Sequence, residues 1–211
     1  MKDLQSIRRE YGDHELQEKT MSSDPFQQFE TWLKEALEIK SLDPTAMVLS
    51  TVDHDGMPDS RVVLLKEFNH DGFIFYTHYK SPKALQAENK IVALNFHWLE
   101  LARQIRMRGS IIRISREKSE TYFLSRPRES QIAACASKQS AVIASRAELE
   151  SRMQKIAKQY EGKQVPCPTD WGGYRVIPFE FEFFQGRDNR MNDRIRYLKQ
   201  NDHWKMDRLS P

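Results

Sequence analysis

Short runs of β-branched and aromatic residues, set apart by tight-turn signals, constrain the fold of this chain more than any other feature. The runs are AMVLSTV at 46–52, SRVVLLKEF at 60–68 and FIFYTHY at 73–79, with Asp55-Gly56 and Asp71-Gly72 between them. Asp-Gly pairs favour the two-residue turns of β-hairpins. The pattern therefore predicts three antiparallel strands in a meander.

Further strand-forming segments extend this set. They lie at 91–98, 102–114, 173–185, 194–199 and 203–209, the last two being joined by Gln200-Asn201-Asp202. Residues 102–114 alternate between apolar and polar side chains, as a strand with one buried face does. The five strands expected up to residue 114 form a set that typically closes into a barrel.

Helical patterns flank the strands. Apolar residues recur at three- and four-residue steps from Phe26 to Leu37, and Ser23 or Asp24 is a suitable N-cap. Further helices are expected from near Ser81, at 115–126 and 129–136 around the break at Pro127, and at 145–160. The fold class is thus mainly β with flanking helices (α+β).

The chain is expected to form one domain. Residues 1–23 are polar and lack sustained periodicity, which predicts a mobile N-terminal arm before a single domain at 24–211. The opening MKDLQSIRRE has no apolar stretch like that of a secretory signal, and no run approaches the roughly 18 apolar residues of a membrane helix. A cytoplasmic location and no membrane partner are expected.

Composition argues against several function classes. The net charge of +3, from 33 basic and 30 acidic residues, does not predict a nucleic-acid partner. Cys135 and Cys167 lack CxxC spacing and are expected to be free thiols, and the six histidines show no HxH or HExxH spacing, so no metal site is expected. The absence of GxGxxG and Walker-type loops argues against a dinucleotide fold or a nucleotide hydrolase.

The segment from Tyr122 to Ser130 carries the most specific chemistry. Tyr122, Arg126 and Ser130 recur at four-residue steps, which place side chains on one helical face. A phenol, a guanidinium and a hydroxyl together offer the donors that a phosphate dianion requires. The alternative is a solvated helix face with one buried tyrosine.

Several spaced motifs resemble one family. YFLSRPRESQ at 122–131, SKQS at 137–140 and SRVVLLK at 60–66 resemble the pyridoxine/pyridoxamine 5′-phosphate oxidase family, and the resemblance extends from RREY at 8–11 to WKMDRLSP at 204–211. It implies a split β-barrel that binds FMN at the interface of a homodimer, both subunits contributing to each of two sites.

The resemblance also implies roles for individual residues. At FMN it places Arg61, Lys66, Tyr76, Thr77, Lys83 and Gln104 of one subunit, Gln139 and Ser140 of the other, and in addition Phe184 and Arg194. At the substrate phosphate it places Lys66, Tyr122, Arg126 and Ser130; Arg190 and Asn192 occupy the catalytic positions over the substrate, and Arg8 and Tyr11 belong to a segment that can fold over it.

One pair of these residues needs an irregular strand. Arg61 and Lys66 are five residues apart, so on an ideal strand they face opposite sides. Either the strand bulges or Lys66 lies at its end.

The chain departs from the family pattern at three positions. The family usually has arginine at Pro82, tryptophan at Phe184 and histidine at Asn192. Pro82 removes a cation near the FMN phosphate, Phe184 keeps a ring but loses an indole donor, and Asn192 cannot carry a proton at neutral pH.

The implied reaction is the oxidation of pyridoxamine or pyridoxine 5′-phosphate by O2. Hydride passes from C4′ to N5 of FMN, O2 reoxidises the flavin, and pyridoxal 5′-phosphate and hydrogen peroxide result, with ammonia from the amine. Two alternatives remain open: a related split-barrel flavin oxidase of the phenazine-biosynthesis type, and a non-catalytic protein that binds pyridoxal phosphate or flavin.

Overall fold

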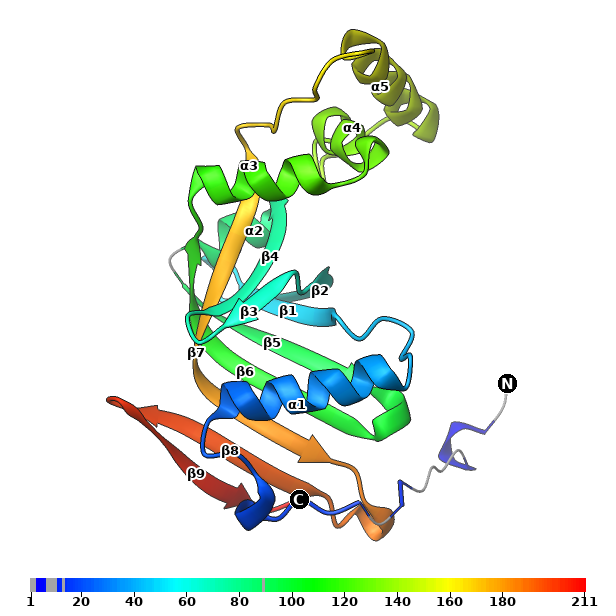
Figure 1. Ribbon diagram of the computed structural model, residues 1–211. Coiled ribbons are helices and arrows are strands. Elements are labelled where there is room, and N and C mark those ends of the chain that lie inside the picture. Colours follow the sequence, from blue (N-terminus) through cyan, green and yellow to red (C-terminus); the bar gives the residue numbers. More distant parts are fainter. Residues whose placement is uncertain (1–2, 7–10, 13, 89) are drawn as a thin grey trace.

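The chain folds around one antiparallel sheet (Figure 1). The computed structural model describes residues 3–6, 11–12, 14–88 and 90–211. In these residues the strands are β1 (Ala46–Val52), β2 (Pro58–Leu64), β3 (Glu67–Asn69), β4 (Gly72–His78), β5 (Ile91–Trp98), β6 (Arg103–Arg113), β7 (Trp171–Gln185), β8 (Asp193–Gln200) and β9 (His203–Leu209). The helices are α1 (Pro25–Glu38), α2 (Pro82–Ala87), α3 (Arg116–Ser125), α4 (Arg128–Ala136) and α5 (Arg146–Gln159), with 3-10 turns η1 (Leu4–Ser6), η2 (Glu18–Thr20), η3 (Leu99–Leu101) and η4 (Asp188–Arg190).

Strand β7 is where the sheet branches. The sheet path runs β2-β1-β5-β6-β7-β4-β3, and β8 and β9 extend from β7 off this path. The first part of β7 pairs with β4, from Trp171 to Val176, whereas its last part pairs with β8, from Glu180 to Gln185. The branch confirms the predicted split-barrel fold, mainly β with flanking helices.

The predicted meander of three strands is wrong at its second strand. Residues 60–68 form two strands, β2 and β3, which lie at opposite ends of the sheet path. Between them the N–H of Leu65 donates to Thr45 O (2.9 Å) while the N–H of Lys66 donates to Ile74 O (2.9 Å). The chain therefore switches from β1 to β4 within two residues, which brings the two sheet edges together.

Helix α1 covers the sheet at its centre (Figure 1). Asp24 caps its start by accepting from the N–H of Phe26, and Pro25 occupies the first turn, where its missing N–H costs nothing. The apolar face buries Phe29 and Trp32, and Phe29 meets Phe73 edge-to-face at 4.8 Å between ring centroids. The expected helix and its Asp24 cap are confirmed.

Helices α3, α4 and α5 lie at one end of the molecule, opposite the β8–β9 hairpin (Figure 1). Phe123, Ile132, Val165 and Trp171 form a separate apolar cluster there. Each helix agrees with its expected range to within one or two residues. None of the helices in the described part of the chain is long and apolar enough to cross a membrane.

The segment expected to be an arm packs on the C-terminal hairpin over part of its length. Leu16 is buried, and its N–H donates to Asp193 Oδ2 (3.0 Å). Farther on, the Tyr197 hydroxyl donates to Ser22 O (2.7 Å). Apart from the single buried side chain of Leu16, these contacts are made by backbone groups, so sequence periodicity gives no sign of them.

Candidate functional site

A cleft of about 390 Å³ lies between β2, β4 and helices α3 and α4. Among the predicted site residues it is lined by Lys66, Tyr76, Thr77, Lys83, Tyr122, Arg126, Ser130 and Gln139. Tyr122 comes from α3, Arg126 follows its end, and Ser130 lies in the first turn of α4 beyond Pro127. The break at Pro127 thus leaves all three predicted phosphate-binding side chains on one cleft.

Arg126 lies in this cleft without a counter-ion among the described residues. Its Nη1 is buried and has no hydrogen-bond partner in that part of the chain, and its guanidinium lies 4.9 Å from the Trp171 ring centroid. Burial lowers the pKa of this guanidinium, because removal from water disfavours the charged form. A half-buried cation with a buried, unused donor is an environment that an anionic ligand completes.

Three aromatic rings form one wall of the cleft. Tyr76 stacks on Tyr122 with 3.9 Å between centroids, and Trp171 lies nearly parallel to Tyr76 at 5.4 Å. Gly173 makes room for this wall, since a Cβ there would lie 2.9 Å from Tyr76 Cε1 and 2.5 Å from Ile114 Cδ1. Burial raises the pKa of Tyr76 to about 12, so its hydroxyl stays a donor.

Lys83 points its ammonium at neutral oxygens. Its Nζ donates to Thr77 Oγ1 (3.4 Å), Ser81 Oγ (3.3 Å) and Gln139 Oε1 (3.2 Å), and no carboxylate pairs with it within the described residues. Burial lowers the pKa of Lys83, and the charge of Arg61 lowers it further. Like Arg126, Lys83 therefore carries a positive charge that no carboxylate neutralises within the described residues.

Arg61 lies beside Lys83 but is already engaged. It donates to Thr51 Oγ1 (2.6 Å) and Gln86 Oε1 (3.3 Å), and it pairs with Asp59. Lys66 lies beyond the end of β2, at the crossing to β3. The end position, rather than a bulge in the strand, therefore explains how Lys66 reaches the cleft.

A second group of predicted residues lies at the other end of β7. Gln104, Phe184 and Arg194 are aligned side by side across β6, β7 and β8. Phe184 is eleven residues from Gly173, the β7 residue that pairs with Tyr76, which corresponds to about 35 Å along a strand. One chain therefore does not bring this group to the cleft.

One chain brings Gln139 but not Gln104 to the cleft. The length of β7 separates Gln104 from Tyr76. Gln139 lies beside Thr77, since its Oε1 accepts from Thr77 Oγ1 at 2.8 Å in the same chain.

The remaining predicted residues lie outside the cleft. Arg190 is exposed and Asn192 half-buried on the loop between β7 and β8, and the backbone of Tyr11 docks on that loop through Asp188. Arg8 lies outside the described residues. Ser140 and Pro82 line an adjoining hollow of about 420 Å³ that shares His78 and Gln139 with the cleft.

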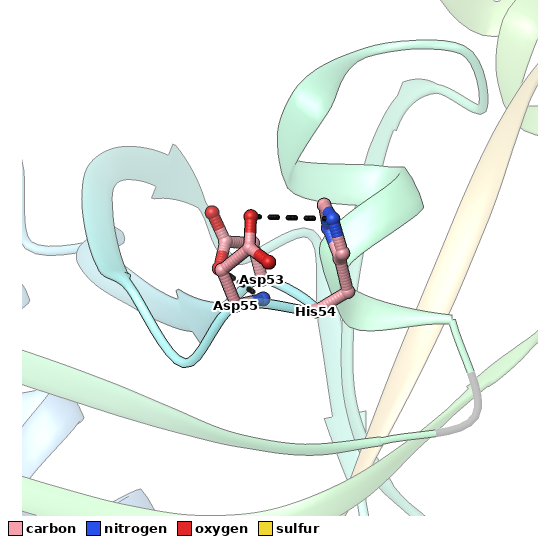
Figure 2. A group of neighbouring side chains, drawn as sticks. All are labelled: Asp53, His54 and Asp55. Carbon is pink, nitrogen blue, oxygen red and sulfur yellow. Dashed lines mark hydrogen bonds and ion pairs between the residues drawn. The ribbon is translucent and has the colours of Figure 1, made fainter.

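Among the described residues, one cluster of two carboxylates and a histidine has its ligand atoms close enough together to hold a metal ion. Figure 2 shows Asp53, His54 and Asp55 at the β1–β2 turn, with their ligand atoms within 4.8 Å of one another. His54 and Asp55 are exposed, and the N–H of Asp55 donates to Asp53 Oδ1 (2.9 Å) as in an ordinary turn. This hydrogen bond within the turn explains why the three side chains lie close together, and no bound ion is needed to explain it.

Sequence reasoning missed several cleft residues, among them an aromatic and a titratable side chain. Trp171 and His78 line the cleft, and burial lowers the pKa of His78, which favours the neutral ring. The double glycine after Trp171 is the one available signal, because paired glycines in a strand mark a close approach of other side chains.

The branched sheet and its cationic cleft define a split-barrel protein with a site suited to phosphorylated ligands. A family model described as pyridoxamine 5′-phosphate oxidase matches residues 33–160, and one described as the pyridoxine 5′-phosphate oxidase C-terminal dimerisation region matches 171–211. The chain belongs to the pyridoxamine 5′-phosphate oxidase family.

Curated relatives match over the full length. A protein of Legionella pneumophila (strain Paris) named pyridoxine/pyridoxamine 5′-phosphate oxidase is 49% identical over 99% of this chain and 97% of its own. A protein of the same name from Rippkaea orientalis is 47% identical over 99% and 100%. PhzG of Burkholderia lata 383, solved with tetrahydrophenazine-1-carboxylic acid, has a TM-score of 0.89 at 27% identity, over 95% of this chain and 100% of that one.

Proposed function

We propose that the chain is an FMN-dependent oxidase that converts pyridoxamine and pyridoxine 5′-phosphate to pyridoxal 5′-phosphate. O2 is the acceptor, hydrogen peroxide is released, and ammonia leaves when the substrate is the amine. The observation that carries this proposal is the buried Nη1 of Arg126, which has no partner among the described residues, in a cleft that Tyr122, Ser130 and Lys66 also line. These are the donors that a phosphate monoester requires.

The cleft fits two phosphates because its cations form two sets. Arg126 and Lys66 would hold the substrate phosphate. Lys83, with the Thr77 hydroxyl and the neighbouring charge of Arg61, would hold the phosphate of FMN. FMN, when bound, supplies the two-electron acceptor that O2 reoxidises.

The protein would act by positioning and by excluding water. The stacked Tyr76, Tyr122 and Trp171 rings give the cleft a rigid apolar wall. The Asn192 side chain does not titrate and cannot act as a general acid or base. Its Oδ1 accepts from the N–H of Arg187 (3.0 Å), so the side chain stabilises the loop on which it lies. We expect no side chain to act as an essential base: the hydride would pass to the flavin, and the proton that the substrate hydroxyl loses would pass to water.

A second copy of the chain completes each site in this proposal. Gln104, Phe184 and Arg194 lie too far along β7 to meet a flavin bound in the cleft of their own chain. In a homodimer, the cleft of one subunit would receive this group from its partner. The match of residues 171–211 to a dimerisation region supports the arrangement.

The test is a peroxide assay on the FMN-loaded protein. We expect peroxide with pyridoxamine 5′-phosphate or pyridoxine 5′-phosphate and almost none with unphosphorylated pyridoxamine. A yellow protein that releases no peroxide with either substrate would instead be a binding protein. Turnover of a tetrahydrophenazine carboxylate in their place would favour the phenazine-type alternative that the likeness to PhzG keeps open.

A cytoplasmic location is part of the same proposal. Its support is the substrate class, because phosphorylated metabolites are charged and stay inside the cell that makes them. Cell fractionation with an antibody against the chain tests it, and recovery from a secreted or membrane fraction would contradict it.

A further inference from the structure

The loop between β7 and β8 holds a conformation that needs support. Asn189 and Arg190 have φ values of 55° and 59°, in the left-handed region that residues with a Cβ rarely adopt. Such residues persist where surrounding contacts hold them, often at functional sites. Arg190 is the residue that the family resemblance places over the substrate.

The N-terminal segment supplies part of this support. Asp188 Oδ1 accepts from the backbone N–H groups of Tyr11 and Gly12, both at 2.9 Å, and its own N–H donates to Gly12 O (3.3 Å). Gly186 leaves space for the segment, since a Cβ there would lie 2.9 Å from Tyr11 Cγ. The segment and the loop thus pack against each other immediately before Arg190.

Asp193 fastens the other end of the loop to the same segment. Its side chain is only 9% exposed. Oδ2 accepts from the N–H of Leu16 (3.0 Å) and from Arg187 Nη1 (3.2 Å), while Oδ1 accepts from Arg208 Nη1 (2.6 Å). One buried carboxylate therefore joins the N-terminal segment, the loop and strand β9.

Arg208 extends this network to η2. Its Nε and Nη2 donate to the two carboxylate oxygens of Glu18 at 2.8 Å each, and Nη2 also donates to Leu16 O (2.6 Å). A bidentate pair of this kind fixes orientation as well as charge. All three guanidinium nitrogens of Arg208 are thereby committed to the segment or to Asp193.

We propose that Asp193 is a positioning residue for the substrate, acting with Arg208 to fasten residues 11–12 and 14–18 to the 186–192 loop and so to hold Arg190 in place. The inference rests on the proposed function for the role of Arg190. The fastening itself is independent of any activity.

Asp193→Asn tests the inference, with Asp207→Asn as its matched control. Asp207 lies on the same hairpin and also accepts from two cations, Arg196 (2.9 Å) and Lys205 (2.9 Å), but it does not reach the N-terminal segment. In Asp193→Asn we expect amide hydrogen exchange in residues 14–18 to become at least about tenfold faster and KM for pyridoxamine 5′-phosphate to rise about tenfold, with a smaller change in kcat. FMN affinity should stay unchanged, and Asp207→Asn should alter none of these quantities.

A double variant separates positioning from general loss of structure. Because Glu18 and Asp193 act through the same arginine, the effects of Glu18→Gln and Asp193→Asn on exchange should be less than additive. Additive effects, unchanged exchange at Leu16, or equal acceleration across β9 would each overturn the proposal. If Asp193→Asn fails to fold, Glu18→Gln remains a usable test, because the Glu18 side chain is half exposed and its replacement leaves the core intact. Glu18→Gln alone must then still speed exchange in residues 14–18.

The exchange measurement also distinguishes this proposal from the proposed function. Wild-type protein that releases no peroxide but protects the amides of residues 14–18, with that protection lost in Asp193→Asn, would reject the oxidase and keep the fastening. Normal peroxide release with unprotected amides in residues 14–18 would reject the fastening and keep the oxidase.

Discussion

At the scale of single residues, Arg126 is the side chain whose environment is hardest to explain without a ligand. It is half-buried, lies over Trp171, and keeps Nη1 unpaired within the described chain. The four-residue spacing of Tyr122, Arg126 and Ser130 predicts their shared face from sequence, but the unpaired donor is visible only after folding. That difference favours the phosphate interpretation over a solvated helix face.

Replacing Arg126 with alanine should weaken substrate binding and spare FMN. Removing a charge-assisted, potentially bidentate donor should cost about 2 to 4 kcal/mol in kcat/KM, mostly through KM, since the phosphate is held equally before and during hydride transfer. Steady-state kinetics and an FMN titration measure both effects. Arg128→Ala is the matched control, because Arg128 donates to Lys163 O and Tyr160 O outside the cleft. Loss of flavin with normal KM would reverse the assignment.

Lys83 should make FMN binding sensitive to alkaline pH. Burial and then the Arg61 charge lower the pKa of Lys83 below its usual 10.5. Only the protonated ammonium attracts a phosphate, so affinity is complete below the lowered pKa and falls as pH rises through it. FMN affinity measured from neutral to alkaline pH should therefore decline in the wild type and stay flatter in Lys83→Arg, which keeps its charge. Parallel profiles for the two proteins would exclude this role.

At the scale of secondary-structure elements, the sequence predicts most strands and helices but not how they connect. The run at 60–68 looks continuous because every residue in it tolerates a strand. Its break at Leu65 and Lys66 depends on partners at Thr45 and Ile74, one before it and one after it in the chain. Long-range pairing of this kind leaves no local signal.

The same limit applies to the site residues on β7. Gln104 and Tyr76 are both implied at one flavin, yet the length of β7 separates them. Local patterns report spacing along the chain, whereas the distance between two site residues depends on strand register. The packing of Leu16 on the hairpin is missed for a related reason, since its decisive contact is to a backbone N–H.

Helix α2 offers a test of the departure at Pro82. Pro82 begins this helix and is exposed beside the hollow that adjoins the cleft. Pro82→Arg should add a cation near Lys83 and tighten FMN binding by about 1 to 2 kcal/mol. Pro82→Ala is the control, because it removes the ring without adding charge. Equal FMN affinity in the two variants would show that residue 82 does not reach the FMN phosphate.

At the scale of the whole molecule, the two groups of site residues lie at opposite ends of β7. Helices α3 and α4 lie at one end of the molecule and the β8–β9 hairpin at the other (Figure 1). The cleft residues Tyr122 and Ser130 belong to those helices, whereas Phe184 pairs with Arg194 of β8. A dimer related by a two-fold axis can place each cleft against the hairpin of its partner. Such a dimer has two identical composite sites and should purify yellow with FMN between subunits.

Mixing two impaired variants tests this composite site directly, with peroxide release measured at a pyridoxamine 5′-phosphate concentration far below the raised KM of Arg126→Ala. Arg126→Ala damages the cleft, and Arg194→Ala damages the hairpin group. In a mixed dimer, one site combines the intact cleft of one subunit with the intact hairpin of the other, so the pair should recover about a quarter of wild-type peroxide release after subunits exchange at random. Each variant alone gives the baseline. As a control for additive residual activity, each variant is cross-linked separately before the two are mixed, so that their subunits cannot exchange. Recovery no greater than that baseline would mean that each chain holds a complete site, and the proposed homodimeric arrangement would then be wrong.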